Sequence, residues 1–173
     1  MSAKNIRIFI TGKPGTGKTT LIMKLSSYLQ EKGINITGFY TEEMRERRKR
    51  MGFKLTTLPD GQISILASTK PAGIPFGRYY VKTDGIDKGI QAIKKDADII
   101  ILDEVGPMEM KHTDFMPVVK KILGSGKNVI AVIHRNWTNM VEEENLYEIT
   151  IENRHDLHKE LKEIVSRYIS DSN

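Results

Sequence analysis

The chain of 173 residues contains no cysteine, which excludes disulfides and any zinc site built on thiolates. It also contains no apolar run of transmembrane length, and Lys4 and Arg7 interrupt the N-terminus before the hydrophobic core of a signal peptide could form. We therefore expect a soluble protein that does not associate with membranes. The absence of cysteine is compatible with a reducing cytoplasm, where we place the protein, and the length suits a single domain over residues 1–173.

A glycine-rich motif lies near the N-terminus, directly after the apolar run that ends at Ile10. The motif has the pattern G-x-x-x-x-G-K-[ST], and its residues are Gly12, Lys13, Pro14, Gly15, Thr16, Gly17, Lys18 and Thr19. Apolar residues at helical spacing follow over residues 18–30. The order of strand, loop and helix is the context that makes this motif a strong indication of a phosphate-binding loop.

The residue types of this loop match the chemistry of a polyphosphate. Glycines allow successive backbone N–H groups to turn toward the α- and β-phosphates, because no Cβ blocks the approach. Lys18 can reach the β- and γ-phosphates, and the Thr19 hydroxyl is a suitable hard ligand for Mg²⁺. The positive end of the following helix dipole points at the same place.

Further strand and helix patterns alternate along the chain. Strands are predicted at 35–40, 79–82, 98–103 and 128–133, with an edge strand at 146–151. Helices are predicted at 86–94 and 113–123, and a last helix is predicted to begin near Asp156, which could cap it. Short alternating runs at 53–57 and 63–66 flank a Pro-Asp-Gly turn and predict an inserted β-hairpin, followed by a loop over 67–77. The pattern predicts an α/β fold whose ligands collect at the carboxyl ends of parallel strands.

Two acidic residues follow the most apolar of these strands. A carboxylate at the end of such a strand commonly holds the Mg²⁺ that bridges the β- and γ-phosphates, and Asp103 is the candidate for that role. Glu104 comes one residue later and points to a different side, where it could orient the water that attacks the γ-phosphorus and accept its proton. The sequence therefore predicts separate roles for the two carboxylates.

The net charge of +5 is concentrated in one segment, where Arg45, Arg47, Arg48, Lys49 and Arg50 stand against Glu46. Such a cluster could bind nucleic acid, could supply cations to a triphosphate, or could form a solvated loop. Arg45 itself lies just past a strand and could neutralise charge on the γ-phosphate in the transition state.

Four stretches together resemble the THEP1-type nucleoside-triphosphatases. They are residues 12–20, which add Thr20 to the loop, residues 38–45, residues 102–109 and residues 152–154. The resemblance implies a three-layer P-loop NTPase with a RecA-like, mostly parallel sheet, and hydrolysis of ATP, GTP, CTP, TTP and UTP to the diphosphate and phosphate with little base selectivity. It also implies a second nucleotide-binding stretch over Ile99, Ile100, Ile101, Leu102, Asp103, Glu104, Val105 and Gly106. The chain departs from the family at Arg48 and Lys49, where small glycines often appear.

Other polar residues have more open interpretations. His134 ends the predicted strand over 128–133 and could sense the γ-phosphate or hold the attacking water, or could hydrogen-bond backbone at the strand exit. Asn153 and Arg154 could contact the ribose or base, and Arg154 could stack on a base face. For Glu109 capping or solvation is favoured over a role around Mg²⁺, and Trp137 is interpreted as a packing or surface residue.

The leading hypothesis is a monomeric, Mg²⁺-dependent nucleoside-triphosphatase. In it the phosphate loop and Lys18 bind the polyphosphate, Thr19 and Asp103 organise the metal, and Glu104 activates water. Two alternatives stay open at this point. A small nucleotide or polynucleotide kinase would use the same parts with an acceptor in place of water, and an NTP-switched module would use the basic cluster to bind RNA or DNA.

Overall fold

A computed structural model describes residues 5–172, so the interruption predicted at Lys4 lies outside the described residues. The strands are β1 (Arg7–Thr11), β2 (Ile36–Glu46), β3 (Lys49–Leu58), β4 (Ile63–Ser68), β5 (Ile74–Phe76), β6 (Tyr79–Val81), β7 (Ile99–Val105), β8 (Val129–Ile133) and β9 (Leu146–Glu148). The α-helices are α1 (Lys18–Glu31), α2 (Thr83–Ile93), α3 (Phe115–Gly124) and α4 (Arg154–Ser172), and short 3-10 turns cover Glu109–Lys111, Arg135–Met140 and Glu143–Asn145.

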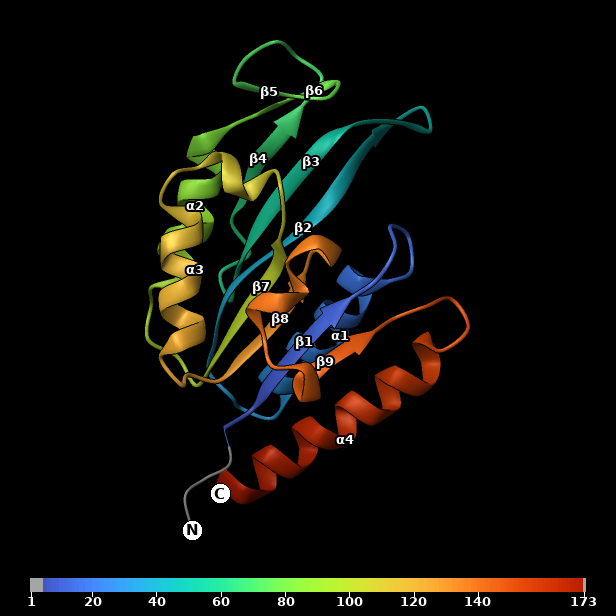
Figure 1. The fold of residues 1–173 in the computed structure, drawn as a ribbon, viewed down its shortest axis with the longest axis vertical. Helices are drawn as coiled ribbons and strands as arrows, with labels where there is room; N and C mark the ends of the chain where they lie inside the picture. Colours follow the sequence, from blue (N-terminus) through green and yellow to red (C-terminus); the bar gives the residue numbers. More distant parts are fainter. Residues whose placement is uncertain (1–4, 173) are drawn as a thin grey trace.

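These strands form one sheet in the order β5-β6-β4-β3-β2-β7-β8-β1-β9 (Figure 1). The five strands from β2 to β9 in this order run parallel, and β3, β4, β6 and β5 extend the sheet from β2 as antiparallel strands. We call the first group the parallel half and the second group the antiparallel extension. In the parallel half, β8 lies between β1 and β7, so the strand before the phosphate loop and the strand before Asp103 are not direct neighbours.

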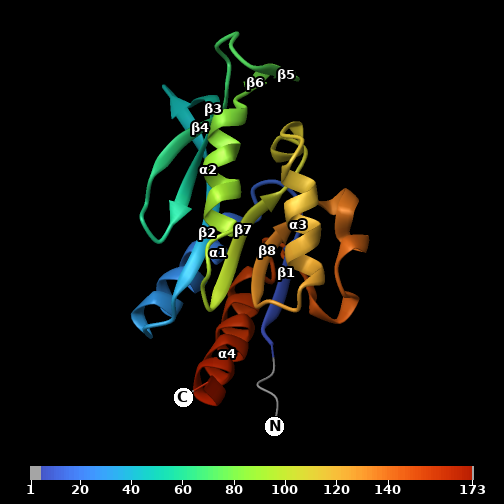
Figure 2. The ribbon, with the colours of Figure 1, turned by 90° about the vertical axis from the view of Figure 1, so that its left-hand side faces the viewer.

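Helices cover both faces of the parallel half, which gives three layers (Figures 1 and 2). Side chains on β7 alternate between them: Ile99 and Ile101 pack in the core beneath α1 and α4, while Ile100 and Leu102 pack in the core beneath α2 and α3. Strands that are buried on both faces need such continuous apolar runs. The predicted α/β fold with a RecA-like parallel sheet is therefore confirmed.

The antiparallel extension is larger than the predicted inserted hairpin. The hairpin over 53–57 and 63–66 is present as part of β3 and β4, but β5 lies within the stretch predicted to be a loop. β2 also continues past residue 40 to Glu46, so the basic cluster forms the tip of a second hairpin and not a loop. Arg47 and Arg48 make its turn with φ of 46° and 67°, since a tight hairpin turn needs left-handed backbone at both central residues.

The start of α4 differs from the prediction as well. The helix begins at Arg154, so Asp156 lies in its first turn, where an acid still interacts well with the helix dipole, and it does not cap the helix. Asn153 precedes the helix and closes the turn: its Oδ1 accepts from the Thr150 N–H at 2.8 Å, and its N–H donates to the Thr150 hydroxyl at 3.1 Å. Across residues 5–172, no helix has both the length and the hydropathy required to cross a bilayer.

Candidate functional site

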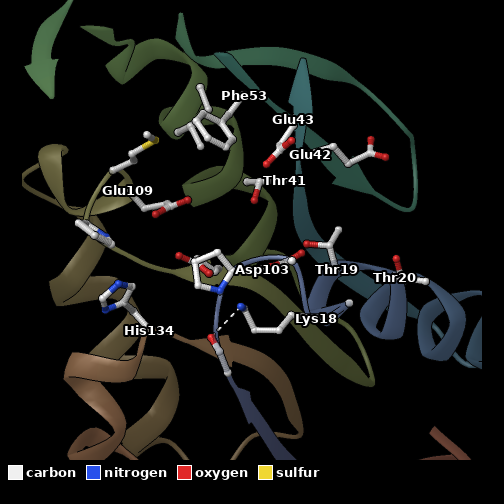
Figure 3. Close-up of a pocket in the computed structure, with 18 of the residues that line it drawn as sticks. Lys18, Thr19, Thr20, Thr41, Glu42, Glu43, Phe53, Asp103, Glu109 and His134 are labelled. Carbon is white, nitrogen blue, oxygen red and sulfur yellow. Dashed lines mark hydrogen bonds between the residues drawn. The ribbon is translucent and has the colours of Figure 1, made fainter. Parts of the chain in front are cut away.

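A cavity of about 600 Å³ lies at the carboxyl edge of the parallel half. The phosphate loop after β1, the acids at the end of β7 and the residues after β8 form one end of it, and residues of the antiparallel extension form the other (Figure 3). This is the edge at which ligands collect in open parallel sheets.

The phosphate loop has the backbone conformation that its glycines predict. Gly15 and Gly17 have φ of 78° and 101°, in the left-handed region that side chains with a Cβ rarely adopt. The Lys18 ammonium donates to the carbonyls of Gly12 and Lys13 at 2.8 and 2.7 Å, so it lies across the loop (Figure 3). Partial burial lowers the pKa of Lys18, and the nearby carboxylates of Glu104 and Asp103 oppose that shift. The lysine is therefore already held where a polyphosphate would bind.

Asp103 lies on the face of β7 that α1 covers, close to Thr19 of that helix. Its side chain is buried, and its Oδ2 atom has no hydrogen-bond partner among the described residues. Burial raises the pKa of Asp103 to about 7, although contact with the Thr19 side chain opposes this rise. A buried carboxylate oxygen without a partner beside a threonine hydroxyl is a donor set suited to a hard divalent cation.

Glu104 and a second carboxylate, Glu109, lie on either side of Gly106. A Cβ on Gly106 would be 2.5 Å from Glu104 Oε1 and 2.9 Å from Glu109 Oε2, so only glycine fits between the two side chains. Burial raises the pKa of Glu104, while Lys18 and His134 oppose the shift. Glu109 is not solvated, because the residue is only 3% exposed and burial raises the pKa of its carboxyl well above the ordinary value.

His134 follows β8 and lines the cavity near Glu104 and Lys18 (Figure 3). Its Nδ1 accepts a hydrogen bond from the Asn136 N–H at 3.3 Å, and its ring lies against Trp137 with centroids 5.1 Å apart. Trp137 is thus a packing residue for His134. Arg135 also lines this end of the cavity, where its charge lowers the pKa of Lys18.

The residues of the second predicted nucleotide-binding stretch fall into two groups, one in the hydrophobic core and one at the cavity. Its apolar members are at most 1% exposed and belong to the two cores beneath the helices; they are Ile99, Ile100, Ile101, Leu102 and Val105. These side chains do not line the cavity, so the stretch reaches it through Asp103 and Glu104. The apolar residues fix the strand, and the strand positions the two acids.

The structure does not bring Arg45 into the cavity. The guanidinium pairs with Glu43, with Nη2 at 2.6 Å from Oε2, and the side chain is 54% exposed. Arg50, its partner across the β2–β3 pair, lines the cavity and also pairs with Glu43. The charge of the basic cluster is therefore partly balanced, because one carboxylate binds two of its five basic side chains.

Asn153 and Arg154 occupy different environments. The Asn153 side chain binds backbone at Thr150 and also at Glu148, where Nδ2 donates to the carbonyl at 2.9 Å, so its polar atoms already have partners. The Arg154 side chain lies beside the phosphate loop, with its Cδ 4.0 Å from the position of a Cβ on Gly17. Of the two residues, Arg154 is the one that remains placed to meet a bound nucleotide.

Arg50 at the other end of the cavity belongs to the basic cluster, but sequence reasoning missed its neighbours there, including Phe53, Leu66, Phe76 and Met108. They come from β3, β4, β5 and the segment after β7, and no short motif links them. The signal that could have found the two aromatic residues is the occurrence of Phe53 in the predicted inserted hairpin and of Phe76 in the predicted loop over 67–77, outside the predicted core strands.

Together, a phosphate loop after β1, acids after β7 and a strand inserted between these two define a P-loop nucleoside-triphosphatase of the RecA-like class. A family model described as NTPase matches residues 7–162. Nucleoside-triphosphatase THEP1 of Methanocaldococcus jannaschii is 46% identical over 161 residues, covering 90% of this chain and 95% of that protein. The chain belongs to the THEP1 family of nucleoside-triphosphatases, and it is a hydrolase that acts on nucleoside triphosphates.

Other relatives agree with this assignment. The THEP1 protein of Thermotoga maritima is 44% identical over 172 residues, covering 93% of this chain and 94% of that protein. The crystal structure of THEP1 from Aquifex aeolicus superposes with a TM-score of 0.69 at 31% identity, covering 91% of this chain and 98% of that one. The solution structure of a human cancer-related nucleoside triphosphatase gives a TM-score of 0.74 at 28% identity, covering 92% and 97%.

Proposed function

We propose that this enzyme is a single-domain monomer that hydrolyses ATP, GTP, CTP, TTP and UTP to the diphosphate and phosphate, with Mg²⁺ as cofactor and low base selectivity. The observation that carries the proposal is the meeting of Lys18, Thr19, Asp103 and Glu104 at one end of one cavity. Each supplies a different requirement of phosphoryl transfer, which is mainly a matter of positioning and charge stabilisation.

Glu104 is the proposed general base. It is the carboxylate that faces both Lys18 and His134, whose charges interact with it. In the reaction it accepts a proton from water as the water oxygen bonds to the γ-phosphorus and the bond to the β,γ-bridging oxygen breaks. The electron pair of that bond leaves with the nucleoside diphosphate. Lys18 and Arg135 provide positive charge at this end of the cavity, and His134 is placed to hold the water.

Thr19 and Asp103 would hold the divalent cation. The fit rests on the buried Asp103 Oδ2 without a protein partner and on the adjacent hydroxyl. Among residues 5–172 no group of three or more acidic, histidine or cysteine side chains could form a complete metal cage. This suits Mg²⁺, which usually keeps waters and substrate phosphates in its coordination shell. When bound, the ion supplies neutralisation of charge on the β- and γ-phosphate oxygens.

Low base selectivity is supported by the surface beyond the loop on the α-phosphate side. A second groove of about 540 Å³ shares Thr20 and Met23 with the main cavity and runs between α1 and α4 past Tyr28 and His158. Its lining includes Met23, which is 36% exposed, and the long cationic side chains of Lys24 and Lys162. A thioether and long cationic side chains offer contact to any ring face, whereas base discrimination needs fixed polar groups at the ring edge.

The experiment is phosphate release from the five triphosphates by the wild type, Lys18→Ala and Glu104→Gln. We expect kcat/KM for the five to agree within about tenfold, and Glu104→Gln to lower kcat by on the order of 10²- to 10⁴-fold without weakening nucleotide binding. Chelation of divalent cations with EDTA should abolish turnover, and MgCl₂ should restore it.

Glu163 on the exposed side of α4 provides the matched control, since Glu163→Gln makes the same chemical change away from the cavity. Turnover of Glu163→Gln at the wild-type rate, beside the loss in Glu104→Gln, would assign the effect to the site. Unchanged turnover in both Lys18→Ala and Glu104→Gln would remove the mechanism.

A further inference from the structure

The main cavity extends well beyond the residues that the hydrolysis of a triphosphate requires. Lys18 and His134 lie at one end, and Phe53 lies at the other, with Thr41 and Glu109 between them (Figure 3). The far end is formed by Arg50, Phe53, Leu66, Phe76 and Met108, which we call the far wall. Binding of the phosphate groups does not require these apolar side chains.

The polarity of the phosphate loop fixes which part of a triphosphate the far wall would face. The loop amides bind the α- and β-phosphates, and Lys18 and the metal ligands reach the β- and γ-phosphates. With that polarity, Thr20 and Arg154, which lies beside Gly17, would face the ribose and base, and Asp103, Glu104 and His134 would face the γ-phosphate. Phe53 of the far wall lies across the cavity from Lys18 and His134 (Figure 3), so the far wall would face the γ-phosphate and not the nucleoside.

The chemistry of the far wall suits a flat ring. Phe53 and Phe76 are half-buried rings from two different strands, and Met108 stands with them as a polarisable side chain. Phe53 is held by neighbours: Tyr79 packs edge-on against it with centroids 5.3 Å apart, and the Arg50 guanidinium lies 5.7 Å from its centroid. Held aromatic rings that still line a cavity are the usual platform for a nucleobase.

The charges around the far wall favour a neutral ligand over a strongly anionic one. The positive charge of Arg50 is already paired with Glu43, and Lys54 is paired with Glu42 at 3.1 Å. The same stretch of cavity carries Glu42, Glu43 and Glu109, and the Lys111 ammonium, 5.7 Å from the Phe76 centroid, is a further cation nearby. Three acidic side chains beside cations that are mostly paired favour a neutral ligand over a phosphate group. A neutral ligand avoids repulsion from these carboxylates.

We propose that the far wall binds a nucleoside, whose hydroxyl replaces water as the acceptor of the γ-phosphoryl group. The inference rests on the proposed function, because it uses the same triphosphate site and the same base. Glu104 takes the proton of the nucleoside hydroxyl as its oxygen bonds to the γ-phosphorus. The bond to the β,γ-bridging oxygen breaks, and its electrons leave with the nucleoside diphosphate. The products are a nucleoside monophosphate, a nucleoside diphosphate and a proton.

The test uses ATP labelled at the γ-position, MgCl₂ and millimolar uridine or adenosine with the full-length enzyme. Labelled nucleoside monophosphate and labelled inorganic phosphate are separated and counted in the same reaction. We expect label in the nucleoside monophosphate to rise with nucleoside concentration and to reach at least about a tenth of the total transferred, since a bound acceptor is oriented and water is not. UMP and AMP in place of the nucleosides should accept far less label.

Substitutions in the far wall test whether phosphoryl transfer to the nucleoside depends on its aromatic rings. Phe53→Leu and Phe76→Leu keep apolar volume and remove the ring, and each should lower the ratio of transfer to hydrolysis by about tenfold through loss of stacking. Tyr80→Leu is the matched control, because Tyr80 is a half-buried aromatic residue of β6 that does not line the cavity. Thermal unfolding of all three variants shows whether each remains folded, and a variant that unfolds is replaced by Met108→Ala.

The outcomes separate the two proposals. Phosphate release that continues without any label in a nucleoside overturns the acceptor site and leaves the hydrolase intact. Failure of phosphate release under all conditions overturns the proposed function itself. Equal transfer to UMP and uridine, or an equal loss of transfer in Tyr80→Leu and Phe53→Leu, also overturns the assignment of a neutral acceptor to the far wall.

Discussion

The parallel half and the antiparallel extension use the same sheet in different ways. Every residue of β8 is buried and the first five of β7 are as well, because helices cover both faces of the parallel half. In the antiparallel extension, β4 begins with an exposed residue and alternates before it becomes buried, and Ile63 is 64% exposed. A strand buried on both faces has little freedom to shift, whereas a strand with one solvated face tolerates change.

This difference in packing explains why the two regions contribute different kinds of residue to the cavity. The parallel half carries the groups proposed for phosphoryl transfer, namely Lys18, Asp103 and Glu104. The antiparallel extension supplies the far wall except for Met108, which follows β7. Positioning errors of about 1 Å can cost on the order of a hundredfold in rate, so the chemistry belongs on the more tightly packed half.

A first test compares how tightly side chains are packed in the parallel half and in the antiparallel extension. Ile101 on β7 is fully buried and Ile63 on β4 is 64% exposed, so the same substitution probes the two regions. Ile101→Ala should lower the free energy of unfolding by about 2–5 kcal/mol through the lost burial and the cavity it leaves. Ile63→Ala should change it by less than about 0.5 kcal/mol. Urea unfolding curves measure both, and losses of equal size would show that the two regions are packed alike.

A second test measures how much folding stability the parallel half loses by burying the Asp103 carboxylate. Burial raises the pKa of Asp103 to about 7 from 3.8, so between these values the folded protein binds more protons than the unfolded chain. The free energy of unfolding contributed by this group therefore falls as the pH rises from about 4 to 7, and is constant above that. In EDTA, Asp103→Asn should be more stable than the wild type at pH 8 by up to roughly 4 kcal/mol.

This stability difference should shrink toward zero as the pH falls to about 4, where the wild-type carboxyl is protonated in the folded protein and about half protonated in the unfolded chain. Urea unfolding at pH 4 and pH 8 measures it. MgCl₂ at pH 8 should stabilise the wild type and leave Asp103→Asn unaffected, since binding to the folded state alone raises its stability. Parallel stability curves for the two proteins across this range would contradict the buried, unpaired state of Asp103.

A third test acts on the spacing of the carboxylates at the cavity. In Gly106→Ala the new methyl group would lie 2.5 Å from Glu104 Oε1, so the Glu104 side chain must move. We expect kcat for phosphate release to fall by about a hundredfold while nucleotide binding changes little. Gly124→Ala at the end of α3 is the control, because a Cβ there meets nothing within 4 Å. Wild-type kcat in Gly106→Ala would show that Glu104 does not need its present position.

The sequence predicted the parallel half well because its signals are local. A glycine motif between a strand and a helix, and an apolar run that ends in two acids, each form from neighbouring residues. Glu109, Phe53 and Phe76 could not be found in this way, since their place at the cavity depends on how η1 (Glu109–Lys111), β3 and β5 pack against distant elements. The catalytic, metal-binding and nucleotide-binding roles of all the predicted site residues stay predictions.

The hairpin that carries the basic cluster also could not be predicted from local sequence signals. Whether Arg45 or Arg50 reaches the cavity depends on the type of the turn at Arg47 and Arg48 and on the irregularity between Met44 and Arg45, and both are set by the pairing of β2 with β3. A change of one residue in this register would exchange the faces of the strand. Composition alone could identify the cluster but not which of its members points inward.

The smallest expected effect distinguishes these two arginines. Arg45→Ala removes an exposed guanidinium whose partners are Glu43 and the Arg48 carbonyl, so turnover should stay within about twofold and the free energy of unfolding within about 1 kcal/mol. Arg50→Ala removes a cation that lies over Phe53 and lines the cavity, so it should lower the ratio of nucleoside phosphorylation to hydrolysis several-fold. Phosphate release and labelled transfer measured side by side decide between them. A tenfold loss of hydrolysis in Arg45→Ala would mean that the hairpin tip closes over the triphosphate, and that the antiparallel extension takes part in the chemistry assigned to the parallel half.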